Sequence, residues 1–151
     1  MTDFLVAALQ ITSTSNVEVN FAEAEEQIEL AARRGAELIG LPENFAFLGG
    51  DDEKLRLASE LSEKCANFLK TMSQRYQVFL LGGGYPVPAG DDSHTFNRSA
   101  HLERTDRFWQ NTTRSTYLML ICQMGIYIRN HPLFYLGRST HLLWMCPIYA
   151  K

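Results

Sequence analysis

The chain has 151 residues, 46% of them apolar, and a formal net charge of -3, which is the composition of an ordinary soluble globular domain. A disordered chain is excluded, and no run approaches the roughly 20 consecutive apolar residues of a membrane span. The start, Met1 to Phe4, lacks the basic-then-apolar order of a signal peptide. We therefore expect a cytoplasmic protein with no membrane partner.

Charge is distributed unevenly along the chain. Residues 1–100 carry 8 basic and 15 acidic residues, a net charge of -7, whereas residues 101–151 carry 6 and 2, a net charge of +4. Both tryptophans, Trp109 and Trp144, also lie in the second segment. A basic, aromatic segment is typical of a nucleic-acid or membrane-surface contact, so this reading has to be weighed against others.

The first elements alternate between strand and helix. Residues 4–11 form a short apolar run that predicts a buried strand, and Asn20 is placed to cap a helix over about residues 21–34. Gly35 closes this helix. Residues 37–41 predict a second strand, which ends at Pro42 because proline cannot donate to a sheet ladder.

The alternation continues to about residue 100. A long helix is predicted over residues 52–76, a third strand over 78–81, a glycine turn over 82–86, a hairpin-like loop over 86–92 and a fourth strand over 93–100. This order predicts an α/β fold with helices packed on a sheet and right-handed crossovers.

The rhythm stops after the fourth strand. From His101 onward no helix has a convincing period or cap, although residues 117–122 are compatible with either a strand or a buried helical turn.

Glu43 is the acid that most needs explanation, because it follows directly after a predicted buried strand. Ligands bind at the carboxyl ends of strands in open α/β sheets, but a solvated loop acid is equally compatible with the position. Partial burial beside Phe45 and Phe47 would make the carboxylate a better proton acceptor toward a thiol or water.

The sequence gives little support for a nucleotide-binding site, a serine nucleophile or a metal site. The glycine run after the third strand matches neither a dinucleotide-binding nor a phosphate-loop pattern, and no G-x-S-x-G elbow is present. The histidines and cysteines show no metal-ligand spacing, and three widely spaced cysteines predict reduced thiols. These side chains are His94, His101, His131, His141, Cys65, Cys122 and Cys146. We expect no metal and no organic cofactor.

Four segments together resemble the amino-terminal part of the nitrilase, or carbon-nitrogen hydrolase, superfamily. They are residues 4–10, the acidic first helix, the run GAELIGLPENF at 35–45 and the run LLGGG at 80–84, so the resemblance covers about residues 4–100. It implies the amino-terminal portion of a four-layer α-β-β-α sandwich, which would be incomplete here.

The resemblance also implies a chemistry. Family members use a Glu, Lys and Cys triad, and Glu43 matches the general base. The Glu deprotonates the Cys, the thiolate attacks an amide or nitrile carbon, the Lys stabilises the tetrahedral intermediate, and water releases an acid. The resemblance further implies a small-molecule amide substrate, no cofactor and homo-oligomers.

The remainder of the triad is missing from the sequence as written. The family's lysine follows the fourth strand in a motif like Y-x-K-x-H-L, but the only lysine after Lys70 is Lys151. Neither Cys122 nor Cys146 stands in the family's C-Y-D type of context.

A codon argument accounts for this break. When residues 111–125 are written as degenerate codons and read from each third base, permitted choices spell YDKIHLFDVDLPDG, and Met124 followed by Gly125 forces the final G. Residues 130–151 permit SSTILSGQEYPPPVDVPDLCK, in which the Trp144 to Cys146 codons force the D-V pair. The first string is the family's lysine motif.

We therefore predict that residues 1–100 are the amino-terminal part of a carbon-nitrogen hydrolase domain and that residues 101–151 are an out-of-frame tail. A sequencing error, a pseudogene or a real truncation would each produce it. The basic, aromatic composition of the tail then has no evolved meaning, and we expect no nucleic-acid partner.

Two functions follow as expectations. The family implies a hydrolase of non-peptide carbon-nitrogen bonds, namely an amidase of small carboxylate-bearing amides, and the out-of-frame string looks most like the branch that includes deaminated glutathione amidase. The alternative is a catalytically inactive fragment that lacks the catalytic Lys and Cys and either binds a partner or misfolds.

Overall fold

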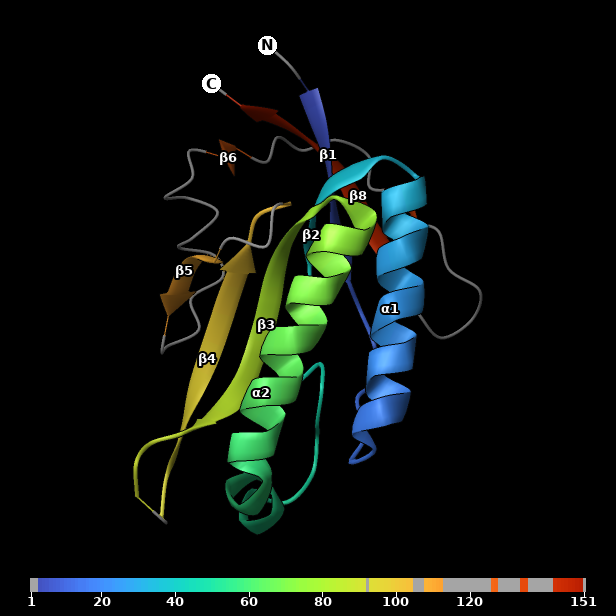
Figure 1. Cartoon of the computed structure of the whole chain (residues 1–151). Helices are drawn as coiled ribbons and strands as arrows, with labels where there is room; N and C mark the ends of the chain where they lie inside the picture. The colour runs from blue at the N-terminus through green and yellow to red at the C-terminus, as the bar shows by residue number, and fades with distance from the viewer. Residues whose placement is uncertain are drawn as a thin grey trace.

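The computed structural model describes residues 3–91, 93–104, 108–112, 126–127, 134–135 and 143–150, and the side chains of residues 5–91 and 93–104. Two helices, α1 (Val17–Arg33) and α2 (Asp51–Tyr76), pack side by side on one face of a sheet (Figure 1). In the described residues the sheet order is β5-β4-β3-β2-β1-β8-β6, with β7 pairing β8.

The strands that position the site lie at the centre of this sheet. β1 (Asp3–Leu9), β2 (Ala36–Gly40) and β3 (Phe79–Pro88) are parallel, and β4 (Thr95–Leu102) runs antiparallel to β3. The remaining strands are β5 (Phe108–Thr112), β6 (Ile126–Tyr127), β7 (Phe134–Tyr135) and β8 (Leu143–Ala150). The predicted α/β fold and its order of elements up to β4 are confirmed.

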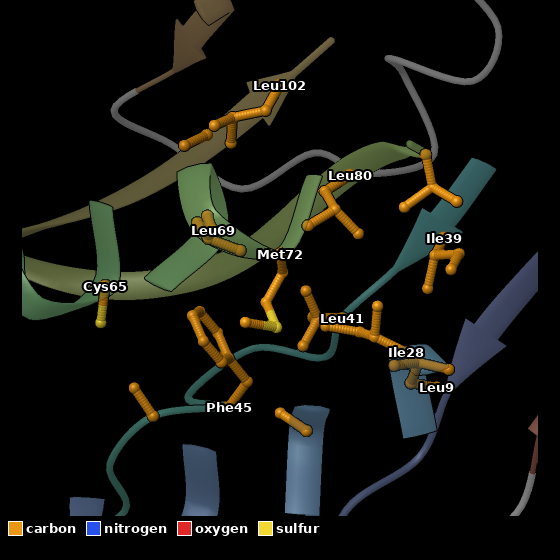
Figure 2. Close-up of a cluster of buried hydrophobic side chains, with 14 of the residues drawn as sticks. Leu9, Ile28, Ile39, Leu41, Phe45, Cys65, Leu69, Met72, Leu80 and Leu102 are labelled. Carbon is orange, nitrogen blue, oxygen red and sulfur yellow. The ribbon is translucent and has the colours of Figure 1, made fainter. Parts of the chain in front are cut away.

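The hydrophobic core fills the space between the two helices and the sheet. Figure 2 shows α2 contributing Cys65, Leu69 and Met72 to this core, against Ile39 of β2 and Leu80 of β3. Each fully buried aliphatic side chain stabilises the fold by about 1.5–3 kcal/mol relative to an exposed one. The core therefore holds both helices against the central strands of the sheet.

The start of α1 differs from the sequence expectation. Asn16, not Asn20, is the N-cap, and its Oδ1 accepts a hydrogen bond from Val19 N at 3.2 Å. Asn20 lies one turn inside the helix and is buried. Its Oδ1 accepts from Thr14 N at 2.9 Å, and its Nδ2 donates to Ala46 O at 2.9 Å. Asn20 thus ties the loop after β1 to the loop after β2.

The glycine run also differs from the sequence expectation, since the predicted turn at residues 82–86 lies inside β3. The glycines are needed there for close packing: a Cβ at Gly82 would lie 2.3 Å from Leu69 Cδ1 of α2. Glycines are common in turns, but a glycine inside a strand also lets a neighbouring element approach closely, as α2 does here.

Beyond Leu102 the helices and strands among the described residues are all strands, and the segment 117–122 lies outside the described residues. Neither α1 nor α2, the two helices of the part described, is long and apolar enough to cross a membrane.

Candidate active site

Glu43 lies just beyond the end of β2, in a loop that is held against β3 on both sides of it. Leu41 N donates to Leu81 O at 2.9 Å, and Asn44 N donates to Gly84 O at 2.8 Å. Pro42 lies between Leu41 and Glu43 and has no backbone N–H, so it needs no hydrogen-bond acceptor. The backbone at Glu43 is therefore fixed by β3 although the residue is outside the regular sheet.

This loop approaches β3 very closely. A Cβ on Gly83 would lie 1.7 Å from the carbonyl oxygen of Pro42, so only glycine fits at this position. Asn44 turns the chain through the left-handed region with φ 58°, which Asn adopts more readily than most residues. From there Phe45 enters the core and packs edge-on against Tyr85, with ring centroids 6.3 Å apart.

Asn97 is the side chain that the fold brings to Glu43. Asn97 Nδ2 of β4 donates to Glu43 Oε1 at 2.7 Å, across 54 residues of sequence. Asn97 pairs with Pro86, whereas Arg98 pairs with Tyr85 of the helix-facing core. Since side chains alternate along a strand, Asn97 points away from the helices.

Asn97 was not predicted as a site residue. In β4 it shares a face with Ser99, opposite Phe96 and Arg98, because side chains alternate along a strand. The register of β4 against β3, which decides that Asn97 reaches Glu43, was not readable from the sequence.

The environment of Glu43 differs from the expectation in one respect. Its side chain is exposed, whereas Phe45 and Phe47 of the same loop are both buried, at 0% and 1% exposure. The two rings do not cover the carboxylate. The partial burial that was expected to make Glu43 a better base is thus absent from the described part of the chain.

The described thiol and amines are on the other side of the fold. Cys65 lies on α2 in the core, and burial raises the pKa of its thiol to about 12, which is unsuited to a nucleophile. All lysines among the described residues, Lys54, Lys64 and Lys70, are also on α2. The structure therefore places Glu43 with Asn97, but not with a described thiol nucleophile.

Two histidines lie on or near β4: His101 is within the strand, and His94 directly precedes it. Within residues 5–91 and 93–104 no group of three His, Cys, Asp or Glu side chains could hold a metal ion. His94 contacts Asp91, whose pKa is lowered to about 2, chiefly by hydrogen bonds from Ser93. His101 is buried, its ring nitrogens have no hydrogen-bond partner among the described residues, and burial lowers its pKa.

Known proteins match this chain in sequence and in fold. The model of the carbon-nitrogen hydrolase family matches residues 5–136. A deaminated glutathione amidase of Synechocystis sp. strain PCC 6803 is 53% identical over 98 residues, which is 64% of this chain and 36% of that protein. The chain thus spans about a third of that relative's length.

Solved structures show the same fold. The C. elegans NitFhit protein superposes with a TM-score of 0.68 at 21% identity, over 91% of this chain and 30% of that chain. A variant of the amidase from Nesterenkonia sp. AN1, which carries acrylamide at its active-site cysteine, superposes with a TM-score of 0.61 at 15% identity, over 90% and 54%.

The family match runs past residue 100, so the boundary between a family segment and an out-of-frame tail stays a prediction. The match nevertheless covers most of the chain, including the strands and the loop that hold Glu43. The chain belongs to the carbon-nitrogen hydrolase family.

Proposed function

We propose that Glu43 is the general base of an amidase that hydrolyses small carboxylate-bearing amides. The observation that carries the proposal is the placement of this carboxylate: its backbone is clamped to β3 at Leu41 and Asn44, and its side chain accepts a hydrogen bond from Asn97. A carboxylate fixed at a strand end, with one oxygen hydrogen-bonded and the other without a partner among the described residues, is equipped to accept a proton.

The reaction class comes from the family and from the relatives. In an amidase of this type Glu43 takes the proton of a thiol, the thiolate attacks the amide carbon, ammonia or an amine leaves, and water then releases the acid. The Synechocystis relative bears the name deaminated glutathione amidase, which favours an amide on a small peptide-like carboxylate as substrate.

The 151-residue chain by itself is proposed to be inactive. Residues 71–150 contain no lysine, so no amine in that stretch stabilises a tetrahedral intermediate, and the thiol of Cys65 is sealed in the core. We attribute the missing lysine to a shift of reading frame near residue 101, after which the permitted string YDKIHLFDVDLPDG replaces residues 111–125.

Two measurements test the proposal. The coding DNA is read first: codons that cannot give YDKIHLF in the shifted frame would remove the frame argument. The full coding region is then expressed as written and with the frame restored, and both proteins are assayed with deaminated glutathione and short ω-amides. We expect hydrolysis only from the frame-restored protein. Hydrolysis by the 151-residue chain, lost on Glu43→Gln, would refute the proposed inactivity.

A further inference from the structure

The strand β4 contributes a polar side chain, Asn97, directly to the Glu43 carboxylate. Asn97 Nδ2 lies 2.7 Å from Glu43 Oε1, and the Asn97 side chain is only half-buried. A neutral amide that donates to a carboxylate forms a charge-assisted hydrogen bond, which is stronger and more directional than a neutral one. The bond restricts the rotation of an otherwise exposed carboxylate.

The backbone beneath Asn97 is shaped to hold its amide. A Cβ on Gly84 would lie 2.5 Å from Asn97 Nδ2, 2.7 Å from its Oδ1 and 2.9 Å from its Cγ, so the amide plane rests directly on Gly84. Gly84 O at the same time accepts the hydrogen bond from Asn44 N. One residue of β3 thus supports both Glu43, through the loop, and Asn97, through the space left by a missing side chain.

We infer that Asn97 is a positioning residue, which orients the Glu43 carboxylate by donating to Oε1 and leaves Oε2 to take the proton. The inference rests on the proposed function of Glu43. It assigns no bond-making step to Asn97, because Asn97 acts only through Glu43. A base held in one rotamer is already oriented toward the proton that it accepts. Small misplacements of catalytic groups can lower a rate by about a hundredfold.

Three variants separate donation from the filling of space. Asn97→Ala removes the donor. Asn97→Asp keeps the shape but replaces the donor with a second carboxylate. Gly84→Ala leaves Asn97 in the sequence but displaces its flexible amide, since the three atoms nearest to the new Cβ all belong to the end of that side chain. If orientation is the role of Asn97, all three variants disturb Glu43.

The first readout needs no activity and uses the 151-residue chain. Carbodiimide-driven amide coupling at pH 6, followed by peptide mass spectrometry, measures the reactivity of Glu43 against that of Glu63, an exposed carboxylate on α2. We expect labelling of Glu43 to rise by about threefold in all three variants, because each removes or displaces a donor that shields Oε1 and stabilises the carboxylate. Labelling of Glu63 should stay constant. Unchanged labelling of Glu43 in the three variants would overturn the inference.

The second readout uses the frame-restored protein. We expect Asn97→Ala and Asn97→Asp to lower kcat by about 10- to 100-fold with KM changed by less than about twofold. Full kcat in Asn97→Asp would show that Asn97 only fills space. If the frame-restored wild-type protein is itself inactive, the proposed function fails, and the labelling experiment alone still decides whether Asn97 orients Glu43.

Discussion

The two faces of the central sheet hold their reactive groups in opposite ways. On the helix-facing side, Cys65 and Tyr85 are sealed in the core, and burial raises the pKa of each to about 12. At the strand ends and on the other side, Glu43 is exposed and Asn97 half-buried, and the two are joined by a hydrogen bond. Burial keeps the Cys65 thiol and the Tyr85 hydroxyl protonated, whereas the Glu43 carboxylate is exposed, which is the arrangement that the proposed proton transfer requires.

The largest expected effect concerns Cys65, on the helix-facing side of the sheet. Because its pKa of about 12 exceeds the ordinary value of 9.0, the Cys65 thiolate at pH 8 should be on the order of a thousandfold scarcer in the native chain than in the unfolded one. Labelling with an iodoacetamide reagent, with and without urea, measures this ratio. Rapid labelling of native Cys65 would show that the helix-facing side is open.

The same shift gives a pH dependence with a defined sign. The folded chain retains the Cys65 proton to higher pH than the unfolded chain, so stability is fully present below about pH 9 and falls as pH rises toward 12. Cys65→Ala should flatten this fall in a urea titration series.

The next largest effect concerns the close approach under Glu43. Gly83→Ala should destabilise the fold by about 3 kcal/mol or more, because its Cβ meets the carbonyl of Pro42, and the main chain would have to move. Gly84→Ala is the matched control, since its Cβ meets mainly the movable amide of Asn97, and it should cost less than about 1 kcal/mol. Urea unfolding of both variants tests the contrast. Equal losses would mean that the loop is not clamped.

A smaller effect is expected at the tie between the two loops. Asn20→Ala should destabilise by about 2 kcal/mol, because Ala46 O and Thr14 N lose their buried partner. Asn16→Ala, which removes only the helix cap, should cost about 1 kcal/mol. If thermal unfolding ranks the two variants the other way round, Asn20 is not what joins the loops.

The smallest expected effect is an increase in the stability of the fold. His101 is buried without a described partner, so His101→Leu should stabilise the fold by about 1 kcal/mol. Burial lowers the pKa of His101, so the unfolded chain binds the proton first and stability should fall as pH drops below about 6.5. The Leu variant should lose part of this acid sensitivity in denaturation curves at pH 5 and pH 7. An unchanged sensitivity would assign it to other groups.

Hydrophobic periodicity was sufficient to predict the type and order of the elements up to β4, although β3 extends to Pro88, into the loop that was predicted over residues 86–92. The boundaries of β1, β2 and α2 fall within about one or two residues of those expected, because each is a buried run or a long amphipathic pattern. Two local predictions were wrong because the residue types concerned occur in more than one structural role. Asn20 has the chemistry of a cap but ties two loops, and the glycines at 82–84 have the composition of a turn but lie in a closely packed strand.

Of the two side chains that meet at the site, the sequence predicted only Glu43, for a similar reason. Glu43 is marked by its position after a strand and by family resemblance, both of which are local in sequence. Its partner Asn97 depends on the register of β4 against β3, and its exposure depends on where Phe45 and Phe47 point. Both are tertiary properties that a local pattern does not encode.

The role of Glu43 is tested most directly by comparing Glu43→Gln with Glu37→Gln in the frame-restored protein. Glu37 is an exposed acid at the other end of β2 that pairs with Arg104, so its substitution controls for the loss of one negative charge. We predict that kcat for amide hydrolysis falls by about 10²- to 10⁴-fold in Glu43→Gln and changes by less than about twofold in Glu37→Gln. An active protein whose kcat survives Glu43→Gln would contradict the account.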